Sequence, residues 1–501
     1  MTFRRVKILD TTLRDGEQTP GVSLPLEKKI VLAQKIDELG ADIIEVGSVI
    51  TSEGERESAK AIVELKKQGL IKAELCTFCR IRSEDIDYAS ECGVDSIHLV
   101  VPVSDLHIRE KLKKDREAVL RLAVEMVKYA KSRGLIVELS GEDASRADLG
   151  FLKRLYQAGI EAGADRICFC DTVGILTPER AREIFSELSK LPAPISVHCH
   201  NDFGMATANT IAALLAGASE AHVTVNGIGE RAGNTALEEV AMVLYSLYKI
   251  KTNIITQKLY TTSRLVSKLT GVPVALNKAM VGGNAFSHEA GIHVHGLVAN
   301  SSTYEPITPE LVGRRRRIIL GKHAGKASIE LALKELGLVA SEKQTGEIVN
   351  RVKELGDKGK RVTDADFQTI AETVLGIYQE AKVKLDQLTV VGGNKGIPTA
   401  SVNLKINGNI VTEAGTGVGP VDAAINALSK AVKGAANIHL EEYHVDAIEG
   451  GTDALVEVWV KLSKNGKTIT ARGARTDIIM ASVEAMLEGI NRLLNGDNKS
   501  N

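Results

Sequence analysis

The sequence lacks the features that mark several classes of protein. No apolar run reaches the length of a membrane span, and the opening "MTFRRVKILD" holds two arginines without a hydrophobic signal core behind them. The formal net charge is −1, from 63 basic and 64 acidic residues, so the chain has no charge excess for nucleic acid or a membrane surface. We expect a cytoplasmic protein that binds neither.

Cysteine is also scarce. Six cysteines in 501 residues cannot form a disulfide framework, and Cys76 and Cys79 form a C-x-x-C pair without a second pair to complete a zinc site. We predict reduced cysteines in the core. The length is too great for one ordinary core, so two or three domains are expected. The cysteines in apolar, strand-like runs are Cys76, Cys79, Cys168, Cys170 and Cys199.

Strand-like and helical segments alternate through the first half of the chain. Eight strand and helix pairs in about 250 residues match an α/β fold, the (β/α)8 TIM barrel, which we assign to residues 1–270. An open doubly wound sheet is the alternative, but its Gly-rich turn after the first strand is missing. The predicted strands are residues 6–10, 43–47, 72–78, 96–101, 135–140, 166–170, 195–200 and 220–226.

Polar residues recur where these strands end. The chemistry of such a barrel lies at the carboxyl ends of its strands, so the recurrence predicts an active site there. Any single polar loop residue would be weak evidence. The residues are Asp10, Arg14, Asp15, Gln18, Glu45, Ser140, Glu142, Asp143, Asp171, Thr172, Asn226, Glu230, Arg231 and Asn234.

Two histidines in "SVHCHNDFG" predict a metal site. His198 and His200 point the same way because side chains alternate along a strand. Two imidazoles with Asp15 from strand one and Asn234 beyond strand eight suit zinc, manganese or a similar divalent ion. The alternative is a pair of hydrogen-bonded core histidines.

Several motifs carry a family resemblance that spans nearly the whole chain. "LRDGEQTPG", "VHCHNDFGMATAN", "NGIGERAGN", "HEAGIHV" and "LGKHAGK" resemble the signatures of the isopropylmalate, homocitrate and citramalate synthase family. These are metal-dependent acyl-CoA condensing enzymes. The resemblance implies a divalent cofactor (Mn, Zn, Mg or Co), with acetyl-CoA and a 2-oxo acid as substrates, condensed before the thioester is hydrolysed.

The resemblance also implies residue roles. Arg14 would grip the keto oxygen, Thr172 the substrate carboxylate with Ser140 beside it, and Glu142 would act in proton transfer. A cation and an arginine on a keto oxygen stabilise the alkoxide that develops there. A salt bridge that only closes the barrel mouth is the alternative for Arg14. The implied metal ligands are Asp15, His198, His200 and Asn234.

The alternation stops after residue 270. We assign residues 271–385 to a mainly helical subdomain, in which "SHEAGIHVH" places His288 close to His293. In the family the second histidine of this motif and the tyrosine of "TYEP" are catalytic and reach a partner subunit's site. The resemblance therefore implies that His293 and Tyr304 are catalytic in a homodimer. A surface histidine cluster is the competing interpretation.

The last segment, residues 386–501, repeats itself. Residues 407–428 and 465–486 align without gaps at an offset of 58, which predicts an α+β domain of two β-β-β-α units. It resembles the family's regulatory domain, which implies a branched-chain amino-acid effector, with isoleucine favoured. A plain dimerisation module is the alternative. The expected effector loop holds Gly415, Gly417, Gly419 and Asp422.

We expect the side chain of the acceptor to be recognised at the ends of strands three and four, around Cys76, Phe78, His98 and Val100. "EVGSVITSEGERE" and "HLVVPVS" resemble the family's citramalate branch, whose acceptor is pyruvate, more than the isopropylmalate branch, which uses 2-oxoisovalerate. Pyruvate is the predicted acceptor. The less favoured alternatives are a homocitrate synthase, a metal-dependent aldolase or lyase on the same barrel, and a non-catalytic amino-acid sensor.

Overall fold

The chain divides into two compact units. The computed structural model describes residues 5–357, 362–377, 381–406, 408–433, 438–447, 456–464 and 467–496. One unit is Met1–Ser287 with Tyr304–Arg317, and the other is His288–Thr303 with Ile318–Asn501. Each is described below by itself. No helix in the described ranges is both long and apolar enough to cross a membrane.

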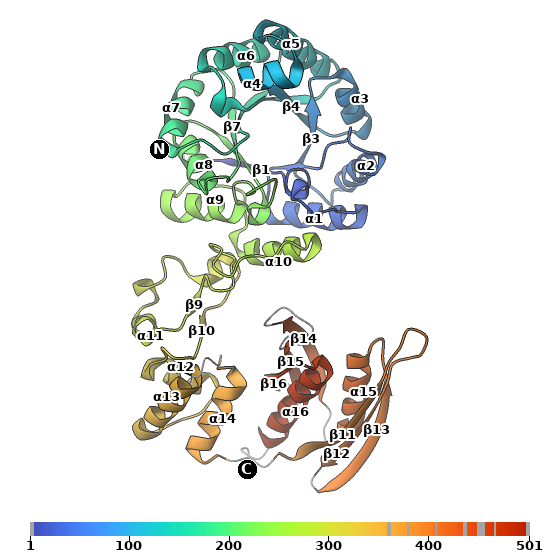
Figure 1. The fold of residues 1–501 in the computed structure, drawn as a ribbon, viewed down its shortest axis with the longest axis vertical. Coiled ribbons are helices and arrows are strands. Elements are labelled where there is room, and N and C mark those ends of the chain that lie inside the picture. The colour runs from blue at the N-terminus through green and yellow to red at the C-terminus, as the bar shows by residue number, and fades with distance from the viewer. Residues whose placement is uncertain are drawn as a thin grey trace. The chain divides into compact units, whose positions relative to one another are not determined.

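Eight parallel strands close a barrel in sequential order, as the sequence predicts (Figure 1). Each strand pairs with the next, and β8 pairs with β1. The carboxyl ends of all eight strands therefore meet at one mouth. The strands are β1 Lys7–Asp10, β2 Ile43–Glu45, β3 Glu74–Arg80, β4 Ser96–Pro102, β5 Ile136–Glu142, β6 Arg166–Asp171, β7 Ile195–Cys199 and β8 Glu220–Val223.

Helices surround the barrel and follow ordinary end signals. Side chains of Ser52, Asp115, Asp148 and Thr177 cap helix starts by accepting backbone N–H groups. Gly40 ends the first helix in the left-handed conformation. The helices are α1 Leu26–Leu39, α2 Glu53–Lys67, α3 Ser83–Cys92, α4 Asp105–His107, α5 Arg116–Ser132, α6 Leu149–Glu161, α7 Pro178–Leu188, α8 Ala206–Leu215, α9 Leu237–Val243 and α10 Leu259–Thr270. Wide π-helical turns, Ile108–Leu112 and Leu244–Tyr248, extend α4 and α9.

The apolar core lies between the outer faces of the strands and these helices. The inner face is different. Its β1–β3 side holds a small apolar cluster of Leu9, Ile43 and Cys76, whereas its β4–β8 side is polar. The buried residues of that polar side include His98, Glu138, Arg166, Cys168, His198, Glu220 and His222.

Short strands and four helices follow the barrel. The strands β9 Ser287–His288 and β10 Arg317–Ile318 pair with each other. Helices α12 to α14 enclose a core of their own around Ile329, Ile348 and Phe367. Thr363 starts α14 with a reciprocal capping box that involves Asp366. The helices are α11 Gly291–Ala299, α12 Lys326–Glu335, α13 Glu342–Asp357 and α14 Asp364–Leu375.

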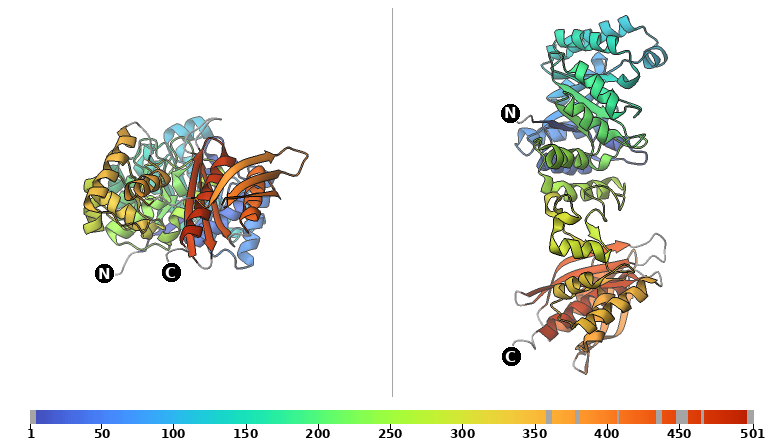
Figure 2. Two further views of the ribbon diagram at one scale, coloured as in Figure 1. Left: turned by 90° about the horizontal axis from the view of Figure 1, so that it is seen from below. Right: turned by 90° about the vertical axis from the view of Figure 1, so that its left-hand side faces the viewer.

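The C-terminal part consists of two β-β-β-α units, which confirms the prediction from the repeat. Each unit is an antiparallel three-stranded sheet, and α15 and α16 pack on their own sheets and on each other around one apolar core (Figure 2). The predicted Asn-Gly turns fall partly outside the described residues, at 407 and 465–466. The elements are β11 Val383–Val391, β12 Thr399–Ile406, β13 Asn409–Thr416, α15 Pro420–Lys433, β14 His439–Ala447, β15 Val456–Lys464, β16 Lys467–Arg475 and α16 Ile478–Gly496.

Candidate active site

Two histidines and an aspartate meet at the barrel mouth. Nε2 of His198 lies 3.4 Å from Nε2 of His200, and Oδ2 of Asp15 lies 3.3 Å from the former and 3.8 Å from the latter. All three side chains are buried. Ligands about 2.0–2.1 Å from one tetrahedral ion are roughly 3.3 Å apart. The three donors are therefore spaced to hold one divalent ion.

Asn234 lies beside these donors. It forms an isolated backbone bridge with His200, which follows the last residue of β7. Its Nδ2 donates to the carbonyl of Ile228 at 3.2 Å, and its buried Oδ1 has no hydrogen-bond partner among the described residues. The same holds for Oδ1 of Asp15. An orphaned buried oxygen is costly unless something satisfies it, so the set fits a cation.

The protonation states also suit a cation. Burial would raise the pKa of Asp15, but Arg14 and His198 hold that pKa well below its ordinary value. Burial and the neighbouring His198 lower the pKa of His200 to about 4. A carboxylate and a neutral imidazole are the forms that bind metals at neutral pH.

Arg14 is fixed between two carboxylates. Its Nε donates to Glu45 at 2.8 Å and its Nη1 to Asp15 at 3.0 Å. Glu45 is in turn 3.0 Å from Nδ1 of His98. Burial opposes the charged form of Glu45, but Arg14 and His98 lower its pKa. If the guanidinium turned away from the mouth, this buried carboxylate would lose its arginine partner and keep only Thr11 and His98.

A cavity of about 240 Å³ opens over these groups. Phe78 and Val100 form its apolar side, and the Arg14 guanidinium lies 5.3 Å from the centre of the Phe78 ring. The volume suits a small acid. The lining residues are Arg14, Asp15, Gln18, Phe78, His98, Val100, Glu142, Cys170, Thr172, His198, His200, Glu230 and Arg231.

Two predicted substrate residues lie elsewhere in the described structure. Cys76 packs with Leu9 and Ile43 in the barrel interior and does not line this cavity. The reason is that β3 continues to Arg80, so Phe78 rather than Cys76 reaches the mouth. Ser140 is also fully buried below the cavity lining.

Glu142 and Thr172 face the cavity on its β5 and β6 side. Lys111 donates to both carboxylate oxygens of Glu142, at 2.7 and 2.9 Å. The backbone N–H of Asp143 donates to the Thr172 hydroxyl at 2.8 Å. Asp143 adopts a left-handed conformation with φ 64°, which is strained for a residue with a side chain. This turn fixes both predicted substrate-facing residues.

The histidine motif follows the barrel in the sequence. His288 and His293 are edge to face, with ring centroids 6.4 Å apart, and His293 is exposed at the start of α11. Tyr304 is 41% exposed. The cavity lining includes none of these three described residues. Their catalytic role stays a prediction that involves a second subunit.

The glycines of the expected effector loop have a local structural explanation. A Cβ on Gly415 or Gly417 would lie 2.4 Å from a backbone nitrogen of α15, whereas one on Gly419 would meet nothing within 4 Å. Asp422 accepts the N–H of Val418 at 2.9 Å. Close packing on α15 therefore requires two of these glycines, and effector binding stays a prediction.

Sequence reasoning placed no cavity residue at Cys170, which lines the cavity. Gln18, Glu230 and Arg231 also line it; the sequence placed them at strand ends but assigned them no individual role. Arg231 bridges Asp202 and the carbonyl of Thr172, both at 2.8 Å. The available signal was the position of Glu230 and Arg231 in a loop that follows a barrel strand.

Three family models match successive parts of the chain. Residues 5–266 match the HMGL-like model, residues 280–360 the homocitrate synthase post-HMGL domain-like model, and residues 361–494 the LeuA allosteric (dimerisation) domain model. The chain therefore belongs to the HMGL-like family of barrel proteins. Its motifs predicted the isopropylmalate, homocitrate and citramalate synthase branch.

Near-full-length relatives narrow this further. The chain is 63% identical over 487 residues to a putative (R)-citramalate synthase of Methanosarcina mazei, covering 97% of this chain and 100% of the relative. It is 57% identical over 493 residues to the (R)-citramalate synthase of Methanocaldococcus jannaschii (98% and 100%). The 2-isopropylmalate synthase of that same organism is 52% identical over 497 residues (98% and 95%).

Proposed function

We propose that this protein condenses acetyl-CoA with pyruvate and hydrolyses the thioester, giving (R)-citramalate and CoA for isoleucine synthesis. The observation that carries the proposal is the higher identity to relatives named (R)-citramalate synthase, 57% against 52% for the 2-isopropylmalate synthase of the same organism. The small cavity with Phe78 and Val100 supports a short acceptor.

Asp15, His198, His200 and Asn234 would hold a divalent ion. Such an ion supplies Lewis-acid polarisation of the keto group and binds the head of the acid. Arg14 donates to the keto oxygen and stabilises the negative charge that develops on it. Because Glu45 holds the guanidinium in place, this stabilisation needs no rearrangement during the reaction.

The side chains opposite orient the substrate and move protons. Thr172 donates its hydroxyl to the substrate carboxylate. Glu142 takes a proton from the acetyl methyl or from water, and Lys111 fixes its carboxylate. The methyl carbon bonds to the keto carbon as its C=O double bond becomes a single bond, and the oxygen takes up the proton that Glu142 removed. Water then adds to the thioester carbonyl, and the C–S bond breaks to release CoA.

Regulation and assembly belong to the rest of the chain. We infer a homodimer in which His293 and Tyr304 complete the partner's active site. The match of residues 361–494 to an allosteric dimerisation domain supports an effector, for which isoleucine is proposed.

The test measures thiol release from acetyl-CoA with pyruvate, 2-oxoisovalerate or 2-oxoglutarate, with and without chelator, and then with isoleucine or leucine. We expect turnover with pyruvate, loss of turnover with chelator and inhibition by isoleucine. No release with any acceptor would refute the synthase proposal. Preference for 2-oxoisovalerate would change only the proposed acceptor. A 2-isopropylmalate synthase is the second candidate, because a relative with that name is 52% identical.

A further inference from the structure

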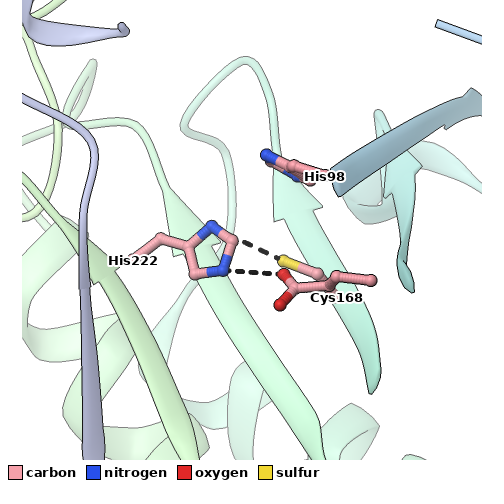
Figure 3. Close-up of side chains that lie close together, drawn as sticks. His98, Cys168 and His222 are labelled. Atoms are coloured by element: carbon pink, nitrogen blue, oxygen red, sulfur yellow. Dashed lines mark hydrogen bonds and ion pairs between the residues drawn. The ribbon is translucent and has the colours of Figure 1, made fainter. Parts of the chain in front are cut away.

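A second cluster of potential metal ligands lies inside the barrel. It consists of His98, Glu138, Cys168 and His222, all buried, with donor atoms within 4.8 Å of one another. Figure 3 labels His98, Cys168 and His222. They come from four different strands. His222 is register-paired with the metal-site residue His198, so it lies directly beside the site already described. The proposed reaction leaves His222 and Glu138 without a role.

The contacts of Glu138 favour an ion-paired brace over a second cation. One oxygen of Glu138 accepts Nε of Arg166 at 2.9 Å, and the other lies 2.8 Å from Nε2 of His222. A cation bound here would have to enter between Glu138 and His222, whose facing atoms are already 2.8 Å apart. The Cys168 sulfur is 4.0 Å from the other nitrogen of the His222 ring.

His222 contacts two histidines of the site already described, His198 and His98. Its ring is edge to face with His198, with centroids 5.6 Å apart, and with His98, with centroids 5.1 Å apart. His98 is bonded to Glu45, which holds Arg14. A single imidazole therefore lies against a metal-ligand ring and against the chain of contacts that orients the guanidinium.

We propose that His222, anchored by Glu138 and Arg166, is a positioning residue that fixes the ring planes of His198 and His98 together. The expected effect of His222 on turnover rests on the proposed function. The expected effect of His222 on metal binding does not depend on the substrate. Groups that orient a metal ligand contribute about 10- to 100-fold to metal affinity. A displacement of about 1 Å in the site can reduce the rate about 100-fold.

The test uses the full-length chain with Co²⁺ as the metal probe. We expect His222→Gln, which removes the ring, to weaken Co²⁺ binding about 10- to 100-fold in competition with a chelator and to change the cobalt absorption spectrum. At saturating metal we expect a lower kcat with the KM for acetyl-CoA unchanged. His222→Phe, which keeps a ring, should restore part of the Co²⁺ affinity.

Val223→Ala is the matched control. Val223 is the next residue on β8, is buried on the outer face, and should cost stability without changing Co²⁺ affinity. If His222→Gln does not fold, the near-isosteric Glu138→Gln decides by the same measurements. Wild-type Co²⁺ affinity and spectrum in a folded variant would overturn the proposal. So would a second tightly bound metal ion per chain that Cys168→Ser removes. If the wild-type chain turned over no acceptor, but His222→Gln still weakened Co²⁺ binding and changed the cobalt spectrum, only the proposed function would be refuted.

Discussion

Arg14 lies against Glu45 in the barrel mouth, with Nε 2.8 Å from Oε2; the Glu45 side chain is fully buried and that of Arg14 is 9% exposed. The pair holds the guanidinium plane against the cavity. Arg14→Lys keeps the charge but cannot reproduce this planar, two-sided arrangement. We expect kcat for thiol release to fall about 100- to 1000-fold, the cost of removing a positioned oxyanion donor.

Arg133→Lys is the control for that substitution, because Arg133 bonds to Asp87 on the outside of the barrel at 2.5 Å. It should leave kcat unchanged. A wild-type kcat in Arg14→Lys would contradict the role of the guanidinium.

Removal of one predicted metal ligand should abolish both metal binding and turnover. His200→Ala leaves Asp15, His198 and Asn234 as ligands. We expect metal affinity to fall by more than about 100-fold, which is more than the loss of a residue that only orients a ligand would cause. Metal content after dialysis and a Co²⁺ titration measure this. His439→Ala, at an exposed histidine of β14, should bind metal normally. Retained turnover in His200→Ala would refute the metal assignment.

Val100 should limit the size of the acceptor. Its side chain borders the cavity beside Phe78, and Val100→Ala removes two methyl groups. Since a methylene contributes about 1 to 3 kcal/mol to such discrimination, we expect the kcat/KM ratio to shift at least about 10-fold towards 2-oxoisovalerate. Val101→Ala, on the outer face of the same strand, should lower stability and leave the ratio unchanged. An unchanged ratio in Val100→Ala would place the acceptor side chain elsewhere.

Asp10 should make the stability depend on pH. Burial raises its pKa from 3.8 to about 7, although the amide and hydroxyl of Thr12 donate to it. The folded chain therefore binds a proton that the unfolded chain has lost, and this contribution to stability declines as pH rises from about 4 through 7. Asp10→Asn cannot ionise, so its melting temperature relative to wild type should increase across that window in chelator. A constant difference would show that Asp10 is ionised when folded.

Two glycines of one loop should differ in their tolerance of a side chain. A Cβ on Gly415 would lie 2.4 Å from Ala427 N, so the backbone must shift. We expect Gly415→Ala to destabilise the C-terminal unit by about 1 to 3 kcal/mol in thermal unfolding, as overpacking does. Gly419→Ala should change stability by less than about 0.5 kcal/mol. Equal effects would contradict the close approach to α15.

Gly419→Ala also tests the effector proposal. Because nothing in the described structure lies within 4 Å of the added carbon, folding should be normal. Loss of isoleucine inhibition in a normally folding variant would place the effector against this loop.

The sequence predicts the eight strands because parallel barrel strands are short, apolar and regularly spaced. It also predicts that His198 and His200 share a face, since this follows from alternation alone. It does not predict where β3 ends. The pairing with β4 carries β3 on to Arg80, so Phe78 borders the cavity and Cys76 lies in the apolar cluster of the barrel interior.

His222 was missed for a related reason. "EAHV" and "IVELS" each hold two polar residues in a strand, but nothing local shows that His222 and Glu138 meet. Their contact requires the closed barrel, which brings β5 and β8 together across its interior.

The polar inner face also affects how the protein responds to heat. Arg166, Glu138 and His222 fill part of the space that aliphatic side chains commonly fill in such barrels. The penalty for withdrawing charges from water falls as temperature rises, whereas the gain from burying apolar surface levels off. The cost of burying the charges at the centre of this barrel should therefore fall on warming.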